Sequence, residues 1–187
     1  MVFTRKRETL GLVLFATALL SLPSPLLAQI DPSKPAGVTK HVVAPKARED
    51  VARDSVVALA KAQLGRRYVL GGERPDEGFD CSGLIRYIMS GLELRLPRTA
   101  ALQALIGREV PKDTERLKPG DLLTFGKGSR ITHVGVYIGN GRYIHASSGA
   151  GKVVESHMDR TPNSLVRSWR GVRRLMTGDT IRLSDAG

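Results

Sequence analysis

At Asp80-Cys81-Ser82-Gly83-Leu84 the sequence carries its only cysteine, and apolar residues at helical spacing follow it through Met89. We expect a helix over residues 81–90 that ends at Gly91, with the thiol in its first turn. The N-terminus of a helix carries partial positive charge, which lowers the pKa of a thiol and favours the nucleophilic thiolate. A buried structural cysteine is the ordinary alternative. The placement of this single thiol favours the catalytic interpretation.

Two histidines, His133 and His145, follow the cysteine in strand-like sequence on either side of Gly139-Asn140-Gly141. An imidazole can take the proton of a thiol and return it to a leaving amine, and a second polar group must orient that imidazole. A three-residue loop, with Gly141 left-handed, pairs residue 135 with 145 and places both histidines on one face of the sheet. A turn on Asn140-Gly141 alone would place them on opposite faces. The triad hypothesis therefore depends on the first register.

Helical patterns precede strand patterns along the chain. We expect helices from about residue 50 to Gly65, over 81–90, and from Arg98 or Thr99 to Ile106. Strands are expected at 122–125, 131–138, 142–147, 153–155 and 172–176. Helices followed by a run of strands predict an α+β fold, in which helices cover one face of a mainly antiparallel sheet.

The first 28 residues have the pattern of a secretion signal. Arg5, Lys6 and Arg7 precede an uncharged apolar run over residues 10–22, and Ala28 offers a cleavage site. We expect a periplasmic or secreted protein, with an uncleaved N-terminal anchor as the alternative. A lipid anchor is not expected, because no cysteine lies near the junction.

The remaining chain divides by composition. Residues 29–48 are rich in Pro, Lys, Ala and Val without helical or strand period, which is typical of a flexible tether. We expect one domain over residues 49–178 and a short C-terminal tail over residues 179–187.

The chain is basic, with a formal net charge of +11. A basic protein outside the cytoplasm meets polyanions such as cell-wall polymers and anionic lipid head groups. Nucleic acid is not expected as a partner, because the basic residues are scattered, aromatic residues make up only 5% of the chain, and no nucleic-acid-binding motif is present.

Five segments together resemble the NlpC family of cell-wall cysteine peptidases, over about residues 50–176. They occur in the order Asp80-Cys81-Ser82-Gly83-Leu84, Leu96-Pro97-Arg98-Thr99, Pro119-Gly120-Asp121-Leu122, His133-Val134-Gly135-Val136-Tyr137 and Ile144-His145-Ala146. The resemblance implies a papain-like α+β fold, with the nucleophile helix packed on the β-sheet. It also implies that Cys81 is the nucleophile, that His133 is the general base and that His145 orients it.

The same resemblance implies a set of substrate contacts. Tyr68 would line the cleft, and Asp80 and Ser82 would contact the peptide stem of the substrate. Neither a metal nor an organic cofactor is implied. The sequence has Arg67 and Leu70 where the family usually has a proline and an aromatic residue, and both departures bear on substrate preference.

The implied activity is hydrolysis of peptidoglycan stem peptides, either between D-glutamate and a diamino acid or at the D-alanyl cross-link. An amidase or acyltransferase acting on another envelope substrate is one alternative, and a catalytically silent wall-binding or scaffold module is another. A zinc site formed by Cys81, His133 and His145 ranks behind these, because a structural zinc ion normally has a fourth ligand. An envelope regulator is expected, since uncontrolled wall cleavage endangers a cell.

Overall fold

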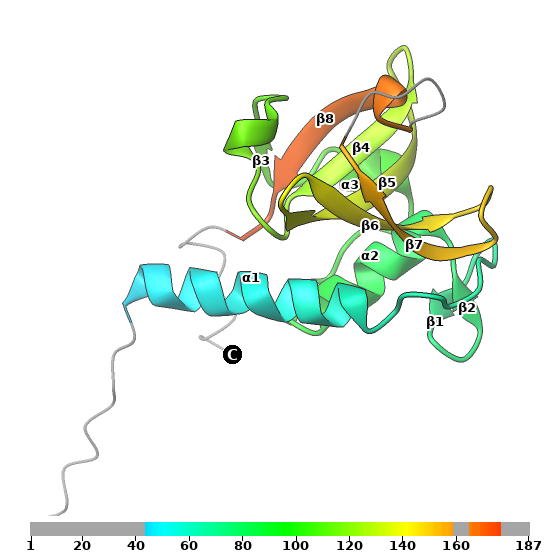
Figure 1. Cartoon of the computed structure of the whole chain (residues 1–187), viewed down its shortest axis with the longest axis horizontal. Coiled ribbons are helices and arrows are strands. Elements are labelled where there is room, and N and C mark those ends of the chain that lie inside the picture. Colours follow the sequence, from blue (N-terminus) through cyan, green and yellow to red (C-terminus); the bar gives the residue numbers. More distant parts are fainter. Residues whose placement is uncertain (1–43, 159–164, 177–187) are drawn as a thin grey trace, which may run out of the picture. The chain divides into compact units, whose positions relative to one another are not determined.

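The computed structural model describes residues 44–158 and 165–176 (Figure 1). The expected signal peptide, the C-terminal tail and residues 29–43 of the expected tether lie outside this range. Within the described part of the chain, no helix is both long and apolar enough to cross a membrane.

The described residues combine helices with an antiparallel sheet, as the α+β prediction requires. The helices are α1 (Pro45–Lys61), α2 (Cys81–Ser90), α3 (Ala100–Gln103) and the short 3₁₀ helices η1 (Thr114–Arg116) and η2 (Leu165–Ser168). A small sheet pairs β1 (Glu73–Arg74) with β2 (Gly78–Phe79). The main sheet has the order β3-β8-β4-β5-β6-β7. Its strands are β3 (Arg108–Val110), β4 (Leu122–Lys127), β5 (Arg130–Gly139), β6 (Arg142–Ser147), β7 (Lys152–His157) and β8 (Trp169–Arg174).

Most predicted elements are confirmed. The cysteine helix has the predicted bounds, 81–90, with Gly91 as its C-cap, and five predicted strands correspond to β4, β5, β6, β7 and β8. The short strands β1, β2 and β3 were not predicted, because strands of two or three residues carry no measurable period. As a correction, α1 begins at Pro45 and not near residue 50. Proline suits the first turn of a helix, where its missing N–H has no partner to lose.

The hairpin between β5 and β6 has the predicted pairing of its strands, but a different loop. Val136 pairs with Ile144 and Tyr137 with Tyr143, so His133 and His145 share a face as predicted. The turn itself consists of Asn140 and Gly141, whose φ angles of 52° and 67° are both left-handed. A β-bulge between Tyr137 and Gly139 shifts the register by one residue. The bulge, and not a three-residue loop, therefore brings the histidines together.

Two apolar clusters bury the two faces of the sheet. One lies between the helices and the sheet and includes Leu84, Ile85, Ile88 and Met89 of α2, all fully buried. The other covers the opposite face and includes Phe125, Tyr143 and Trp169. Figure 1 shows α1 and α2 together on one side of the strands. Burying a large apolar side chain contributes about 1.5–3 kcal/mol, so the four residues of α2 fix its position on β5 and β6.

A buried ionic cluster attaches α1 to the rest of the domain. Arg53 of α1 donates to the carbonyl oxygens of Pro119 (2.7 Å) and Met176 (3.0 Å). Its guanidinium lies 3.9 Å from Asp121, which also accepts hydrogen bonds from Arg174 at 2.6 and 2.7 Å. The cluster joins the first helix, the start of β4 and the end of β8.

Candidate active site

Cys81 is the first residue of α2, and Asp80 is its N-cap. The Asp80 carboxylate accepts a hydrogen bond of 2.7 Å from the backbone N–H of Gly83, as an N-cap side chain does. A Cβ at position 83 would collide with the carbonyl oxygen of Gly72, so glycine lets the helix approach this neighbouring loop closely. The Asp-Cys-Ser-Gly sequence thus sets where the thiol begins the helix.

Arg98 forms an ion pair with the Asp80 carboxylate. Its guanidinium donates to both carboxylate oxygens, at 2.6 and 3.1 Å, and donates to the Ser82 hydroxyl at 2.9 Å. The N–H of Gly71 supplies a further hydrogen bond of 2.9 Å. Burial would raise the pKa of Asp80, but the hydrogen bonds from Arg98, Gly83 and Gly71 together hold it below its ordinary value. Asp80 is therefore an ionised, fully hydrogen-bonded group beneath the thiol.

The electrostatic environment of Cys81 differs from the expectation. Burial raises the pKa of the thiol above its ordinary value, and the negative charge of Asp80 acts in the same direction. The backbone amides of Val134, Ser82 and Cys81 act in the opposite direction and lower the pKa, but by less than burial raises it. The structure thus differs from the lowered pKa expected at a helix N-terminus, because burial is the largest effect on the pKa of this thiol.

The two histidines form a direct pair across β5 and β6. The Nε2 atom of His133 lies 2.8 Å from the Nδ1 atom of His145, and the rings meet edge to face. The Nε2 atom of His145 lies 3.1 Å from the Ser156 hydroxyl on β7. These contacts leave Nδ1 of His133 as the nitrogen that can accept a proton. In that state His133 donates from Nε2 to His145, and His145 donates from Nε2 to Ser156.

Both histidines are neutral at physiological pH in this environment. Burial lowers the pKa of His133 to about 4. Burial, and next the neighbouring His133, lower that of His145 to about 3. The site at rest therefore contains a neutral thiol and neutral imidazoles, and a proton must move when the thiol reacts.

A cleft of about 470 Å³ opens above the thiol. Tyr68, Asp80, Cys81 and Ser82 line it. All three residues that the sequence singled out for substrate contact therefore lie at this cleft. Thr132, which directly precedes His133, lies on the same cleft. Leu70, one of the departures from the family pattern, also lines it and is 83% exposed. Among the described residues no group of three or more His, Cys, Asp or Glu side chains could bind a metal ion.

Comparison with known proteins places this geometry in a family. The sequence model of the NlpC/P60 family matches residues 65–170, which include the nucleophile helix and both histidines. The chain belongs to the NlpC/P60 family. The resemblance inferred from the sequence motifs is thereby confirmed.

Several named bacterial proteins are similar to this chain in sequence. Gamma-DL-glutamyl hydrolase of Bacillus subtilis is 41% identical over 115 residues, which make up 59% of this chain and 27% of that protein. Murein DD-endopeptidase MepH of Escherichia coli is 36% identical over 137 residues, 71% of this chain and 50% of that protein. The chain thus spans half or less of the length of these two relatives.

Solved NlpC/P60 structures share the fold. The peptidoglycan hydrolase RipB of Mycobacterium tuberculosis is 33% identical, with a TM-score of 0.59 over 72% of this chain and 69% of its own. An NlpC/P60 family protein of Bacillus cereus is also 33% identical, with a TM-score of 0.60 over 67% of this chain and 40% of its own. These neighbours confirm the papain-like α+β fold that the resemblance implied.

Two residues of the candidate site were missed by the sequence analysis. Arg98 was quoted within a motif but given no role, and its contacts with Asp80 span 18 positions of sequence. Ser156 lies in the strand expected at 153–155, one position beyond its predicted end. Ser156 can be recognised as a neighbour of His145 only once the strand pairing is known. His145 pairs with Val154, and Ser156 is the next residue of β7 on the same face.

Proposed function

We propose that this chain is a cysteine endopeptidase that hydrolyses an amide bond in peptidoglycan stem peptides. The main support is the arrangement of three residues from α2, β5 and β6. Cys81 begins α2 against the backbone of Val134, and the adjacent His133 contacts His145 at 2.8 Å. A nucleophile, a base and a group that orients the base are the parts that acyl transfer needs.

The proton movements follow from the resting state. As the Cys81 sulfur attacks the scissile carbonyl carbon, Nδ1 of His133 takes the thiol proton, and the imidazolium is stabilised by His145. The oxyanion of the tetrahedral intermediate lies near the N–H groups of Cys81 and Ser82 at the start of α2. His133 then returns the proton to the departing amine, which leaves a thioester on Cys81. His133 next deprotonates a water molecule, whose oxygen attacks the thioester, releases the acid and restores the thiol.

Tyr68, Asp80 and Ser82 are the proposed substrate contacts. Tyr68 is half-buried at the cleft, and burial raises the pKa of its phenol, so the hydroxyl keeps its proton and can donate to a substrate carbonyl. The oxygens of Asp80 already accept hydrogen bonds from Arg98, Gly71, Gly83 and Ser82. Asp80 therefore acts on the substrate mainly through the groups it orients, Ser82 and Arg98.

Two bonds are candidates for cleavage. Two of the relatives are named a gamma-DL-glutamyl hydrolase and a murein DD-endopeptidase, and these names refer to a γ-glutamyl bond and to a DD bond. The γ-D-glutamyl bond to the diamino acid and the D-alanyl cross-link therefore both remain in the proposal. The exposed Leu70 at the cleft is a candidate determinant of this choice, since it replaces an aromatic residue of the family.

We infer a periplasmic or secreted location for this activity. The basic n-region and the apolar run before Ala28 support an export signal. The positive charge of the chain favours binding to anionic wall polymers. An envelope regulator would limit the reaction to sites of wall growth.

Digestion of purified peptidoglycan tests the proposal. The protein and its Cys81→Ala variant are incubated with peptidoglycan, and the released fragments are analysed by mass spectrometry. Fragments that appear only with the intact thiol support the peptidase, and their masses identify the bond. No release by the wild-type protein, with its thiol confirmed reduced, would favour a silent wall-binding module or an enzyme of another envelope substrate.

A further inference from the structure

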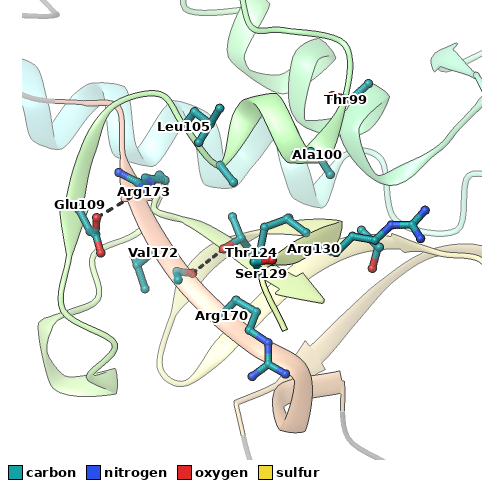
Figure 2. A pocket seen from close by; sticks show the side chains of 15 residues that line it. Thr99, Ala100, Leu105, Glu109, Thr124, Ser129, Arg130, Arg170, Val172 and Arg173 are labelled. Carbon is teal, nitrogen blue, oxygen red and sulfur yellow. Dashed lines mark hydrogen bonds and ion pairs between the residues drawn. The ribbon is translucent and has the colours of Figure 1, made fainter. Parts of the chain in front are cut away.

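A second, larger groove adjoins the cleft of Cys81. It lies between α3 and the sheet and has a volume of about 700 Å³, against about 470 Å³ for the cleft (Figure 2). Thr99, Ala100 and Thr132 line both, so the two spaces are continuous. Tyr68 and Asp80 line the cleft alone. The groove is therefore an extension of the site at the end marked by Thr99 and Thr132.

Small residues and arginines line much of the groove. Ala101, Ala104 and Gly171 leave room along its length. Arg173 lies 3.4 Å from Glu109, and Figure 2 shows this pair at one end of the groove and Arg130 at the other, with Arg170 projecting from β8.

Two of these arginines lack an acidic partner. The side chains of Arg130 and Arg170 are exposed, and no acidic residue of the described ranges pairs with either. The groove thus has an excess of positive charge beside the nucleophile, and an anionic occupant would complement it.

We propose that this groove binds a carboxylate-bearing segment of the peptide substrate, on the leaving-group side of the scissile bond, through Arg130 and Arg170. This proposal rests on the function proposed above. Thr132, which lines both spaces, directly precedes His133 in β5, so the groove begins next to the residue that would protonate the leaving amine. A guanidinium presents two parallel N–H donors that match the two oxygens of a carboxylate.

A binding experiment with paired peptides tests the groove separately from catalysis. The full-length Cys81→Ala variant is titrated with a stem peptide that contains the γ-D-glutamyl bond and ends in the free α-carboxylate of the diamino acid, and with the matching carboxamide. The same titrations are made after adding Arg130→Gln and Arg170→Gln together. Arg95→Gln is the matched control, because Arg95 is also exposed but lines neither the groove nor the cleft.

The expected result is that the carboxylate peptide binds about tenfold more tightly than the carboxamide, which is what two solvent-facing ion pairs contribute together. This preference disappears in the double arginine variant and persists with Arg95→Gln. The preference should also weaken as salt is raised.

Equal affinity for the two peptides, or no binding of either, would overturn the groove as a carboxylate subsite. A carboxylate preference that survives in the double arginine variant would do the same. These failures are distinguishable from failure of the proposed function, which is judged by thiol-dependent release of fragments from peptidoglycan and not by affinity.

Discussion

At the scale of single residues, Ser156 is the least expected member of the site. Its hydroxyl lies 3.1 Å from Nε2 of His145 and can accept the proton of that nitrogen, as the tautomer in which His145 accepts a hydrogen bond from His133 requires. In the proposed mechanism Ser156 is a positioning residue, since it contacts His145 and would act on the reaction only through the two histidines.

We expect Ser156→Ala to lower kcat about tenfold, with little change in KM, because the loss of one hydrogen bond misorients the base without touching the substrate. Ser156→Thr keeps the hydroxyl and should restore most of the rate. The kinetics of stem-peptide hydrolysis measure both effects. An equal loss in the two variants would indicate that Ser156 serves packing alone.

The thiol of Cys81 should behave as a protonated group at neutral pH. Burial raises its pKa above the ordinary value of 9.0, so the thiolate fraction is small at pH 7 and grows only as pH approaches and passes that value. The rate of alkylation by iodoacetamide, followed by intact mass, should therefore rise continuously from about pH 7 to about pH 9. A plateau of fast alkylation already reached below pH 7 would contradict this environment and restore the thiolate expected from the helix N-terminus.

At the scale of elements, the start of α2 depends on the link between Asp80 and Arg98. Arg98→Ala would leave the Asp80 carboxylate buried without its charged donor. We expect the free energy of unfolding to fall by about 1–3 kcal/mol, a range reduced from that of fully buried pairs because the Arg98 side chain is 34% exposed.

Urea unfolding measures this change, with Arg95→Ala as the control. Arg95 is exposed on the same connection between α2 and α3, and its removal should alter stability by less than about 0.5 kcal/mol. Equal effects of the two substitutions would show that the contacts of Arg98 with Asp80 and Ser82 contribute nothing to stability.

The elements also show what could be predicted from the sequence. The helix at 81–90 followed from apolar spacing and an Asp N-cap, which are local signals. The shared face of His133 and His145 was predicted correctly, but by a different loop from the one observed. A three-residue loop and a two-residue turn with a bulge in β5 give the same pairing of the strands further from the turn. Only the cross-strand hydrogen bonds near the turn distinguish the two arrangements. The β3–β8 pair joins residues more than 60 positions apart and had no local signal.

At the scale of the whole molecule, the site could be predicted in its residue types but not in its energetics. Cys81, His133 and His145 were predicted as site residues from spacing and motifs. The raised pKa of the thiol depends on how α2, β5 and their neighbours together exclude water. The groove beside the cleft is formed by α3, β4, β5 and β8 jointly. Properties that arise from several packed elements have no signature in any one segment.

The stability of the whole domain should depend on pH through its histidine pair. The pKa values of about 4 for His133 and about 3 for His145 lie below the unfolded value of 6.5, because burial disfavours the charged imidazole. Between pH 6.5 and 4 the unfolded chain binds more protons than the folded chain, so stability is complete above pH 6.5 and falls as pH is lowered.

Thermal unfolding measured from about pH 7 to about pH 4.5 should show this fall, and a variant with both histidines replaced by glutamine should show a shallower one. The contribution of Asp80 is separate, because its pKa lies below 3.8 and its stabilisation is lost only at lower pH. A melting temperature that stays constant or rises as pH falls through this window would contradict the neutral, buried pair.

The most direct test of the account is the rate of hydrolysis of a defined stem peptide by the wild-type protein, Cys81→Ala, His133→Ala and Arg95→Gln. The account predicts that removal of either Cys81 or His133 lowers kcat by about a thousandfold or more, since nucleophile and base act as a unit. Arg95→Gln should remain within about twofold of the wild type. Hydrolysis at equal rates by the wild-type protein and Cys81→Ala would contradict the central claim, because the thiol would then have no part in the reaction.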